Sequence, residues 1–264
     1  MLKNTTKAKL LAGETVHGCF LKYPQPALAE IIAMAGFDFV LFDGEHGTLQ
    51  PSDIEDLVRA AELRGATPLA RVTTNQPQMI LRYLDTGLHG VQVPWVNTTQ
   101  DVELAVQYTK YGPRGIRGLA GGRASDWGLL ESIGDYTARA NRETMLIVHI
   151  ETADAVELVD EYVKVDGVDV LFLGPTDLSH SLGHPGHVDH PDVQAALQHV
   201  ADVVRPSDKA LGIYAGTASF AREWQERGAR YIATSVESVL LRGFQSYLDD
   251  VGARTQWPPK DEAR

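Results

Sequence analysis

Short apolar runs alternate with longer segments of helical periodicity along almost the whole chain. The segments between the runs often open on proline and close on glycine, as in residues 26–36 and 51–65. The runs themselves have the length and composition of buried strands and cover residues 15–21, 37–42, 67–72, 90–96, 145–148, 168–173, 210–214 and 230–234. Eight strands alternating with about eight helices predict one domain, a (β/α)8 TIM barrel, over residues 1–264.

An open doubly wound sheet is the alternative arrangement for the same alternation. It calls for a glycine fingerprint directly after the first strand, and HGCFLKYP at residues 17–24 does not supply one. The glycine-rich stretch 112–122 follows a predicted helix, so we interpret it as a mobile loop. Residues 1–13 form a polar N-terminal lead, and we expect the tail at residues 253–264, which carries two prolines and mixed charge, to be flexible.

The amino-acid composition limits the kinds of molecule that the protein can be expected to bind. The formal net charge of −11 argues against nucleic acid and anionic membranes as partners, and an anionic substrate would need a local positive patch. Cys19 is the only cysteine, which excludes an internal disulfide and a cysteine-based metal site. No run approaches the roughly 20 apolar residues of a membrane span, and the N-terminus lacks a signal-like apolar region. We therefore expect a soluble cytoplasmic protein.

Reactive groups of a parallel barrel lie where the strands end, on one rim. The polar residues at those positions are Asp43, Glu45 and His46 after the second strand, Arg71 at the end of the third, Glu151 after the fifth, and Thr176 and Asp177 after the sixth.

Glu151 and Asp177 follow neighbouring strands, beside Gly174 and Pro175. Two carboxylates that meet at a rim make half a site for a hard divalent cation, which completes its shell with water and substrate. The competing interpretation is that both acids are solvated or cap the helices that follow them.

Arg71 and His46 are the candidates for substrate chemistry. A guanidinium at a strand end holds a carboxylate or an enolate oxygen, although it also pairs with any nearby acid. A histidine near neutrality suits a general base, and a carboxylate on its second nitrogen would raise its basicity. Asp43, Glu45 and Asp85 are available for that role.

Other chemistries have weaker support. The histidines of HSLGHPGHVDH (residues 180–190) are interrupted by proline and glycine and have no cysteine beside them, so we interpret the stretch as a polar loop over the barrel mouth and not as a zinc site. No G-x-S-x-G elbow occurs, and neither the fifth nor the sixth strand carries a lysine for a Schiff base. Of the catalytic chemistries considered, metal catalysis by carboxylate ligands remains.

Several motifs, taken in order and spacing, resemble the HpcH/HpaI aldolases, class II pyruvate-dependent enzymes of the phosphoenolpyruvate/pyruvate barrel superfamily. The resemblance covers roughly residues 13–251 and is carried by FDGEHG, the strand end at Arg71, YLDTG, VQVPWV, PRGIRG, HIET and FLGPTDLS.

The resemblance implies that Glu151 and Asp177 bind a divalent metal (Mg, Mn or Co), which pyruvate chelates through its carboxylate and keto oxygens. It implies that Arg71 stabilises the enolate, that His46 is the acid/base, and that Asp85 raises the basicity of His46. The backbone around Thr176 would contact the substrate carboxylate. His149 stands where the family commonly has Gln, two residues before the metal-binding Glu, and we place it among the substrate-binding residues.

The expected reaction is reversible aldol cleavage of a 4-hydroxy-2-oxo acid to pyruvate and an aldehyde, as in the 4-hydroxy-2-oxoheptanedioate and 2-dehydro-3-deoxyglucarate aldolases. The alternatives are a related carbon–carbon lyase or synthase of citryl, malyl or citrate-synthase type, and a non-catalytic metabolite-binding barrel. The resemblance further implies a homo-oligomer, a hexamer or trimer, that assembles through the C-terminal helix. Val239, Phe244, Tyr247 and Leu248 give that helix an apolar face, and the competing interpretation is that this face closes the helix's own barrel.

Overall fold

Eight parallel strands form a closed ring in sequence order. A computed structural model describes residues 3–253. Each strand pairs with its neighbours along the chain, and the first also pairs with the last, which closes the barrel. The strands are β1 (Val16–Leu21), β2 (Phe39–Asp43), β3 (Thr67–Arg71), β4 (Gly90–Val93), β5 (Met145–Ile150), β6 (Val170–Leu173), β7 (Ala210–Tyr214) and β8 (Tyr231–Ser235). The predicted (β/α)8 TIM barrel is confirmed.

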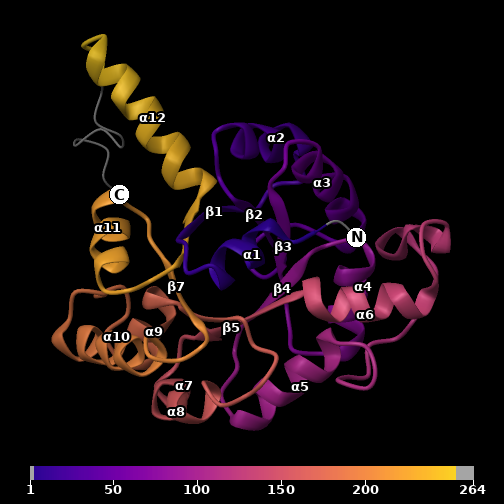
Figure 1. The fold of residues 1–264 in the computed structure, drawn as a ribbon. Helices are drawn as coiled ribbons and strands as arrows, with labels where there is room; N and C mark the ends of the chain where they lie inside the picture. The colour runs from indigo at the N-terminus through magenta and orange to yellow at the C-terminus, as the bar shows by residue number, and fades with distance from the viewer. Residues whose placement is uncertain (1–2, 254–264) are drawn as a thin grey trace.

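Helices surround the ring (Figure 1) and follow the predicted segments to within a few residues. Proline at the first helical position starts several of them, because its fixed φ suits a helix and its missing N–H is not needed there. They are α2 (Pro26–Met34), α3 (Pro51–Leu63), α4 (Pro77–Asp85), α5 (Thr99–Thr109), α7 (Ala153–Glu157), α8 (Val159–Tyr162), α10 (Pro191–Val204), α11 (Ala218–Glu226) and α12 (Val236–Asp250).

Four further elements have no counterpart among the predicted ones: α1 (Thr5–Leu11), η1 (Arg123–Gly128), α6 (Ile133–Glu143) and α9 (Pro175–Ser181). The first lies within the polar lead, at one end of the barrel (Figure 1). Asn4 caps this helix and donates a hydrogen bond to the carbonyl of His89, while Leu10 is buried in the barrel interior. The lead therefore closes the N-terminal end of the barrel, although it is too short and too polar to show helical periodicity.

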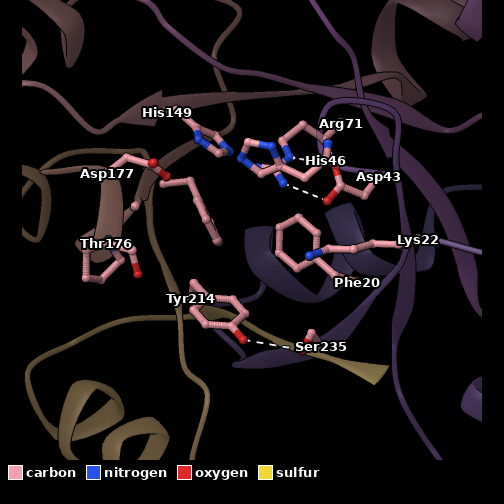
Figure 2. Close-up of a pocket in the computed structure, with 13 residues that line it drawn as sticks. Phe20, Lys22, Asp43, His46, Arg71, His149, Thr176, Asp177, Tyr214 and Ser235 are labelled. Carbon is pink, nitrogen blue, oxygen red and sulfur yellow. Dashed lines mark hydrogen bonds and ion pairs between the residues drawn. The ribbon is translucent and has the colours of Figure 1, made fainter. Parts of the chain in front are cut away.

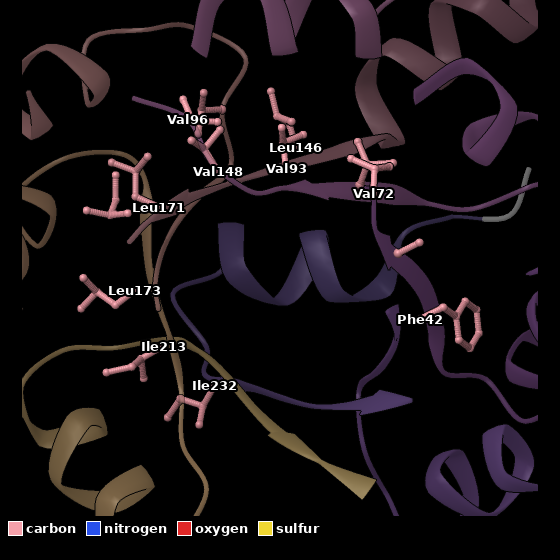
Figure 3. Close-up of a cluster of buried hydrophobic side chains, with 14 of the residues drawn as sticks. Phe42, Val72, Val93, Val96, Leu146, Val148, Leu171, Leu173, Ile213 and Ile232 are labelled. Atoms are coloured by element: carbon pink, nitrogen blue, oxygen red, sulfur yellow. The ribbon is translucent and has the colours of Figure 1, made fainter. Parts of the chain in front are cut away.

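The core has two layers. Inside the ring, Phe39 stacks on Tyr231 with ring centroids 4.3 Å apart, among small and aliphatic side chains. Outside the ring, aliphatic strand residues such as Val148 and Leu171 pack under the helices (Figure 3). Because side chains alternate along a strand, every strand serves both layers. The barrel is thus filled, and open space remains at its ends.

Residues 112–122 form no helix or strand. Of the tail predicted to be flexible at residues 253–264, all but Ala253 lies outside the described residues. None of the helices within residues 3–253 is both long enough and apolar enough to span a membrane.

Candidate active site

A cavity of about 270 Å³ opens at the carboxyl ends of the strands. Figure 2 shows its side chains converging from opposite sides of the ring. Those lining it are Phe20, Lys22, Asp43, His46, Arg71, His149, Phe172, Gly174, Pro175, Thr176, Asp177, Tyr214 and Ser235. Of the predicted site residues, His46, Arg71, His149, Thr176 and Asp177 are brought together here.

The carboxylates of Glu151 and Asp177 both lie close to Gly174. A Cβ atom added at Gly174 would be 3.1 Å from Oε2 of Glu151 and 4.0 Å from Oδ2 of Asp177, so the two carboxylates face one small space. Asp177 lines the cavity, whereas Glu151 is buried beside it. Each carboxylate oxygen has two lone pairs, so the pair retains acceptors for a hard cation. The residues present therefore fit a divalent metal, and glycine leaves the space for it.

The carboxylate of Glu151 is held on both oxygens. Oε1 accepts a hydrogen bond of 2.7 Å from the backbone N–H of Trp95, and Oε2 lies 2.6 Å from Nδ1 of His149. Burial acts to raise the pKa of Glu151, but the His149 ring, the Trp95 amide and the charge of Arg71 outweigh it and lower this pKa to about 2. Glu151 is therefore ionised, as a metal ligand must be.

His149 belongs to a buried chain of polar groups. Its Nε2 lies 2.5 Å from the side-chain nitrogen of Gln92, and the side-chain oxygen of Gln92 accepts a hydrogen bond of 3.4 Å from the Tyr231 hydroxyl. Since the amide nitrogen only donates, Nε2 must accept, and Nδ1–H then donates to Glu151. The chain of partners thus orients the His149 ring between Gln92 and Glu151.

Arg71 is fixed by two acids. Its Nε and one terminal nitrogen donate to the two oxygens of buried Asp43 at 2.9 and 2.7 Å, and the other terminal nitrogen lies 2.9 Å from Glu45. The guanidinium also lies 5.1 Å from the centroid of the Phe20 ring. A bidentate pair of this kind orients the arginine at the cavity wall. Arg71 is thus ion-paired, as the second interpretation expected, and it also lines the cavity.

His46 is exposed at the cavity, on the loop after β2. Its backbone N–H donates to Asp43, but no carboxylate within residues 3–253 forms a hydrogen bond with its ring. Asp85 ends α4 and pairs with Arg117 at 3.0 Å. That helix runs back against the strands, so Asp85 lies at the opposite rim. Within one chain, the expected contact between Asp85 and His46 is absent.

The stretch 180–190 begins in the last turn of α9, runs to the start of α10 and contributes no side chain to the cavity. The rings of His184 and His190 stack with centroids 3.4 Å apart, and both rings approach Asp192. Three potential ligand atoms therefore come within 4.8 Å of one another at the surface.

Sequence reasoning missed four residues of this region. Lys22, Tyr214 and Ser235 line the cavity at the ends of β1, β7 and β8, and Figure 2 shows the hydrogen bond that the Tyr214 hydroxyl donates to Ser235. The rule used for the other strand ends would have found these three. Gln92 points into the barrel from β4, where a buried amide in an apolar strand was the available signal.

A parallel barrel with carboxylates, a histidine and an arginine around one small cavity is the arrangement of a metabolic enzyme. A sequence model of the HpcH/HpaI aldolase/citrate lyase family matches residues 17–243. The 5-keto-4-deoxy-D-glucarate aldolase of Escherichia coli (strain K12) is 37% identical over 251 residues, which cover 94% of this chain and 96% of that protein.

Several solved protein structures are also similar to this chain. An HpcH/HpaI aldolase/citrate lyase family protein from Burkholderia cenocepacia J2315 has a TM-score of 0.89 and 34% identity, covering 94% of this chain and 99% of that one. The citrate synthase SbnG has a TM-score of 0.83 and 30% identity over 93% and 96% of the two chains. The chain belongs to the HpcH/HpaI aldolase/citrate lyase family, and it is a carbon–carbon lyase of the aldolase type.

Proposed function

We propose that this protein is a class II aldolase that cleaves a 4-hydroxy-2-oxo acid reversibly to pyruvate and an aldehyde. The similarity to 5-keto-4-deoxy-D-glucarate aldolase points to a sugar-acid-derived substrate of that class. The single observation that carries the proposal is the approach of the Glu151 and Asp177 carboxylates to the same glycine, Gly174, at a rim shared with Arg71 and His46.

Glu151 and Asp177 would hold the cation, for which Mg, Mn and Co are the candidates. When bound, a divalent cation supplies Lewis-acid polarisation of the 2-oxo group. His149 would keep Glu151 oriented through Nδ1 and form the wall beside the oxo acid. Thr176 and the backbone around it would contact the substrate carboxylate.

His46, acting through a water, takes the proton of the C4 hydroxyl. The C3–C4 bond then breaks, the aldehyde leaves, and the electron pair of the bond passes to the pyruvate fragment as an enolate. Arg71 faces the negative charge that develops, and its rigid pairing with Asp43 means that little reorganisation is needed during the reaction. Return of the proton to C3 gives pyruvate.

Pyruvate release from 5-keto-4-deoxy-D-glucarate, measured with and without a chelator, tests this function. We expect release that stops on chelation and returns with added Mn²⁺ or Mg²⁺. Pyruvate release that persists after complete metal removal would contradict the class II mechanism. A protein that binds oxo acids but never turns them over would be the non-catalytic barrel.

A citrate-synthase-type condensation is the second candidate, because the structural similarity to the citrate synthase SbnG extends over nearly the whole chain. This reaction would use the same two side chains, Glu151 and Asp177, but it joins two carboxylic acids. Formation of citrate from oxaloacetate and an acetyl donor, in the absence of any aldolase activity, would favour it.

Self-association through α12 is part of the proposal. Leu241, Phe244 and Tyr247 are more than half exposed on this helix, which extends away from the barrel (Figure 1). An apolar face of this kind on an extended helix favours a second copy of the chain as its cover. A homo-oligomer, a trimer or hexamer, is the expected state.

A further inference from the structure

A second cavity, of about 600 Å³, lies at the N-terminal end of the barrel. It is lined by α1, by the segments that follow α5 and end α6, and by the residues that lead into β6, β7 and β8. The cavity is therefore at the opposite end from the candidate active site, and the two share no lining residue.

Basic side chains predominate in this cavity. Against three acids, Asp166, Asp169 and Asp208, six basic residues line it: Lys7, Lys110, Arg114, Arg142, Lys209 and Arg230. The chain as a whole has a net charge of −11, so a cavity with an excess of positive charge runs against the composition. A local excess of this kind attracts anions.

The three acids are already paired within the cavity. Lys7 lies 2.9 Å from Asp169, Lys209 lies 3.1 Å from Asp208, and Arg114 pairs with Asp166. Among the described residues, Lys110, Arg142 and Arg230 therefore form no ion pair with a carboxylate.

These three cations contact only carbonyl oxygens within residues 3–253. Arg142 donates to the carbonyl of Ala138, and Arg230 donates to the carbonyls of Leu10 and Lys209 at 2.9 and 3.2 Å. An arginine has five N–H donors, so both retain donors for a ligand.

Lys110 is the most constrained of the three, since it is only 2% exposed. Its Nζ donates to the carbonyls of Asn141 and Thr144 at 3.1 and 2.6 Å, and its third N–H has no acceptor among the described residues. Burial, together with the charges of Lys7 and Arg114, lowers the pKa of Lys110 to about 8, although the charges of Asp169 and Asp166 act to raise it. A buried cation without a carboxylate is costly, and a bound anion would remove that cost.

We propose that the N-terminal cavity is a binding site for a small dianion, a phosphate monoester or a dicarboxylate, held by Lys110, Arg142 and Arg230. Lys110 contributes an N–H from the buried wall, and the two arginines contribute paired donors from α6 and from the start of β8. The helix α1 lines the same cavity through Lys7, Leu10 and Leu11. The site is independent of the aldolase chemistry.

Isothermal titration calorimetry tests the site with two probes, inorganic phosphate and malonate, on the Mg²⁺-loaded protein against chloride at matched ionic strength. We expect one site per chain for at least one probe, and saturating pyruvate should leave it unchanged. Binding of phosphate alone assigns the site to phosphate esters, and binding of malonate alone assigns it to dicarboxylates.

Substitutions locate the binding. Arg142→Gln, an exposed position, should weaken binding at least about 10-fold, equal to about 1.4 kcal/mol, and Lys110→Met should abolish it. Arg59→Gln makes the same change on an exposed arginine of α3, far from the cavity, and should have no effect. If Lys110→Met does not fold, Arg230→Gln takes its place. Equal weakening in Arg142→Gln and Arg59→Gln, displacement by pyruvate, or no binding above the chloride control would each overturn the proposal.

Discussion

Nδ1 of His149 lies 2.6 Å from Oε2 of Glu151, with both side chains buried. A histidine at this position has a consequence that a glutamine would not have, because an imidazole ring offers one donor and one acceptor in fixed directions. The acceptor is used by Gln92 and the donor by Glu151. The barrel interior thereby orients the carboxylate proposed to bind the metal, as partners behind metal ligands generally do.

Gln92→Leu removes the polar group that lies against Nε2 of His149, while keeping a similar volume. We expect Mn²⁺ to bind about 10-fold more weakly, because Glu151 loses its oriented donor. Calorimetric titration of the metal measures this. Tyr231→Phe, which removes only the hydroxyl beyond Gln92, should have a smaller effect, and an unchanged metal affinity in Gln92→Leu would exclude the positioning role.

Arg71→Ala is expected to lower turnover, but the pairing with Asp43 and Glu45 makes it a poor test by itself. Removing the guanidinium leaves two acids without their cation and should cost about 3–5 kcal/mol of unfolding free energy. Arg71→Lys keeps the charge and loses the bidentate geometry. We expect its kcat to fall about 100-fold with a stability change near 1 kcal/mol. Unaltered kcat in folded Arg71→Lys would remove the enolate role.

Acid should destabilise the protein partly through Asp43. Burial acts to raise its pKa, but the hydrogen bonds and charge of Arg71, with the amides of His46 and Glu45, lower the pKa below its ordinary value of 3.8. A carboxyl group with a lowered folded-state pKa stabilises the fold above the unfolded-state pKa and loses that contribution as the pH falls toward the folded-state value.

Urea unfolding at pH 6 and at pH values around 3 to 4 measures the contribution of Asp43 to the free energy of unfolding. Asp43→Asn should be less stable than the natural chain at pH 6, and it should lose less of its unfolding free energy on acidification. Parallel losses in the two proteins would show that Asp43 does not contribute to the acid sensitivity.

The exposed face of α12 predicts that a charge on it disrupts assembly. Phe244→Glu should lower the mass measured by light scattering, because a carboxylate cannot be buried in an apolar contact without a partner. Ser246→Glu places the same charge at an exposed polar position of the helix and serves as the control. A monomeric natural chain, or equal masses for both variants, would contradict the proposed interface.

The barrel was predictable because short apolar runs alternate with helical segments along the chain. Because polar residues follow several of these runs, Glu151, Asp177, Arg71 and His46 could be placed on one rim from the sequence alone. The helical spacing of apolar residues can be recognised only in a segment of several turns. The helices α1 and α9 have seven residues each and are too short to show it.

Contacts that depend on three-dimensional packing were not predictable. The pairing of Gln92 with His149 joins β4 to β5 inside the barrel, and neither residue marks the other in the sequence. The resemblance placed Asp85 beside His46, although the residue ends a helix and so belongs to the other rim of the same chain. The chain order alone could have shown this.

Direct measurement of Mn²⁺ binding is the most immediate test of the central claim that Glu151 and Asp177 share one cation. Titration followed by electron paramagnetic resonance should find one site per chain in the natural protein. Glu151→Gln and Asp177→Asn should each weaken that site at least about 100-fold, because each removes one of two anionic ligands. Retention of full Mn²⁺ affinity in the folded double variant would contradict the account.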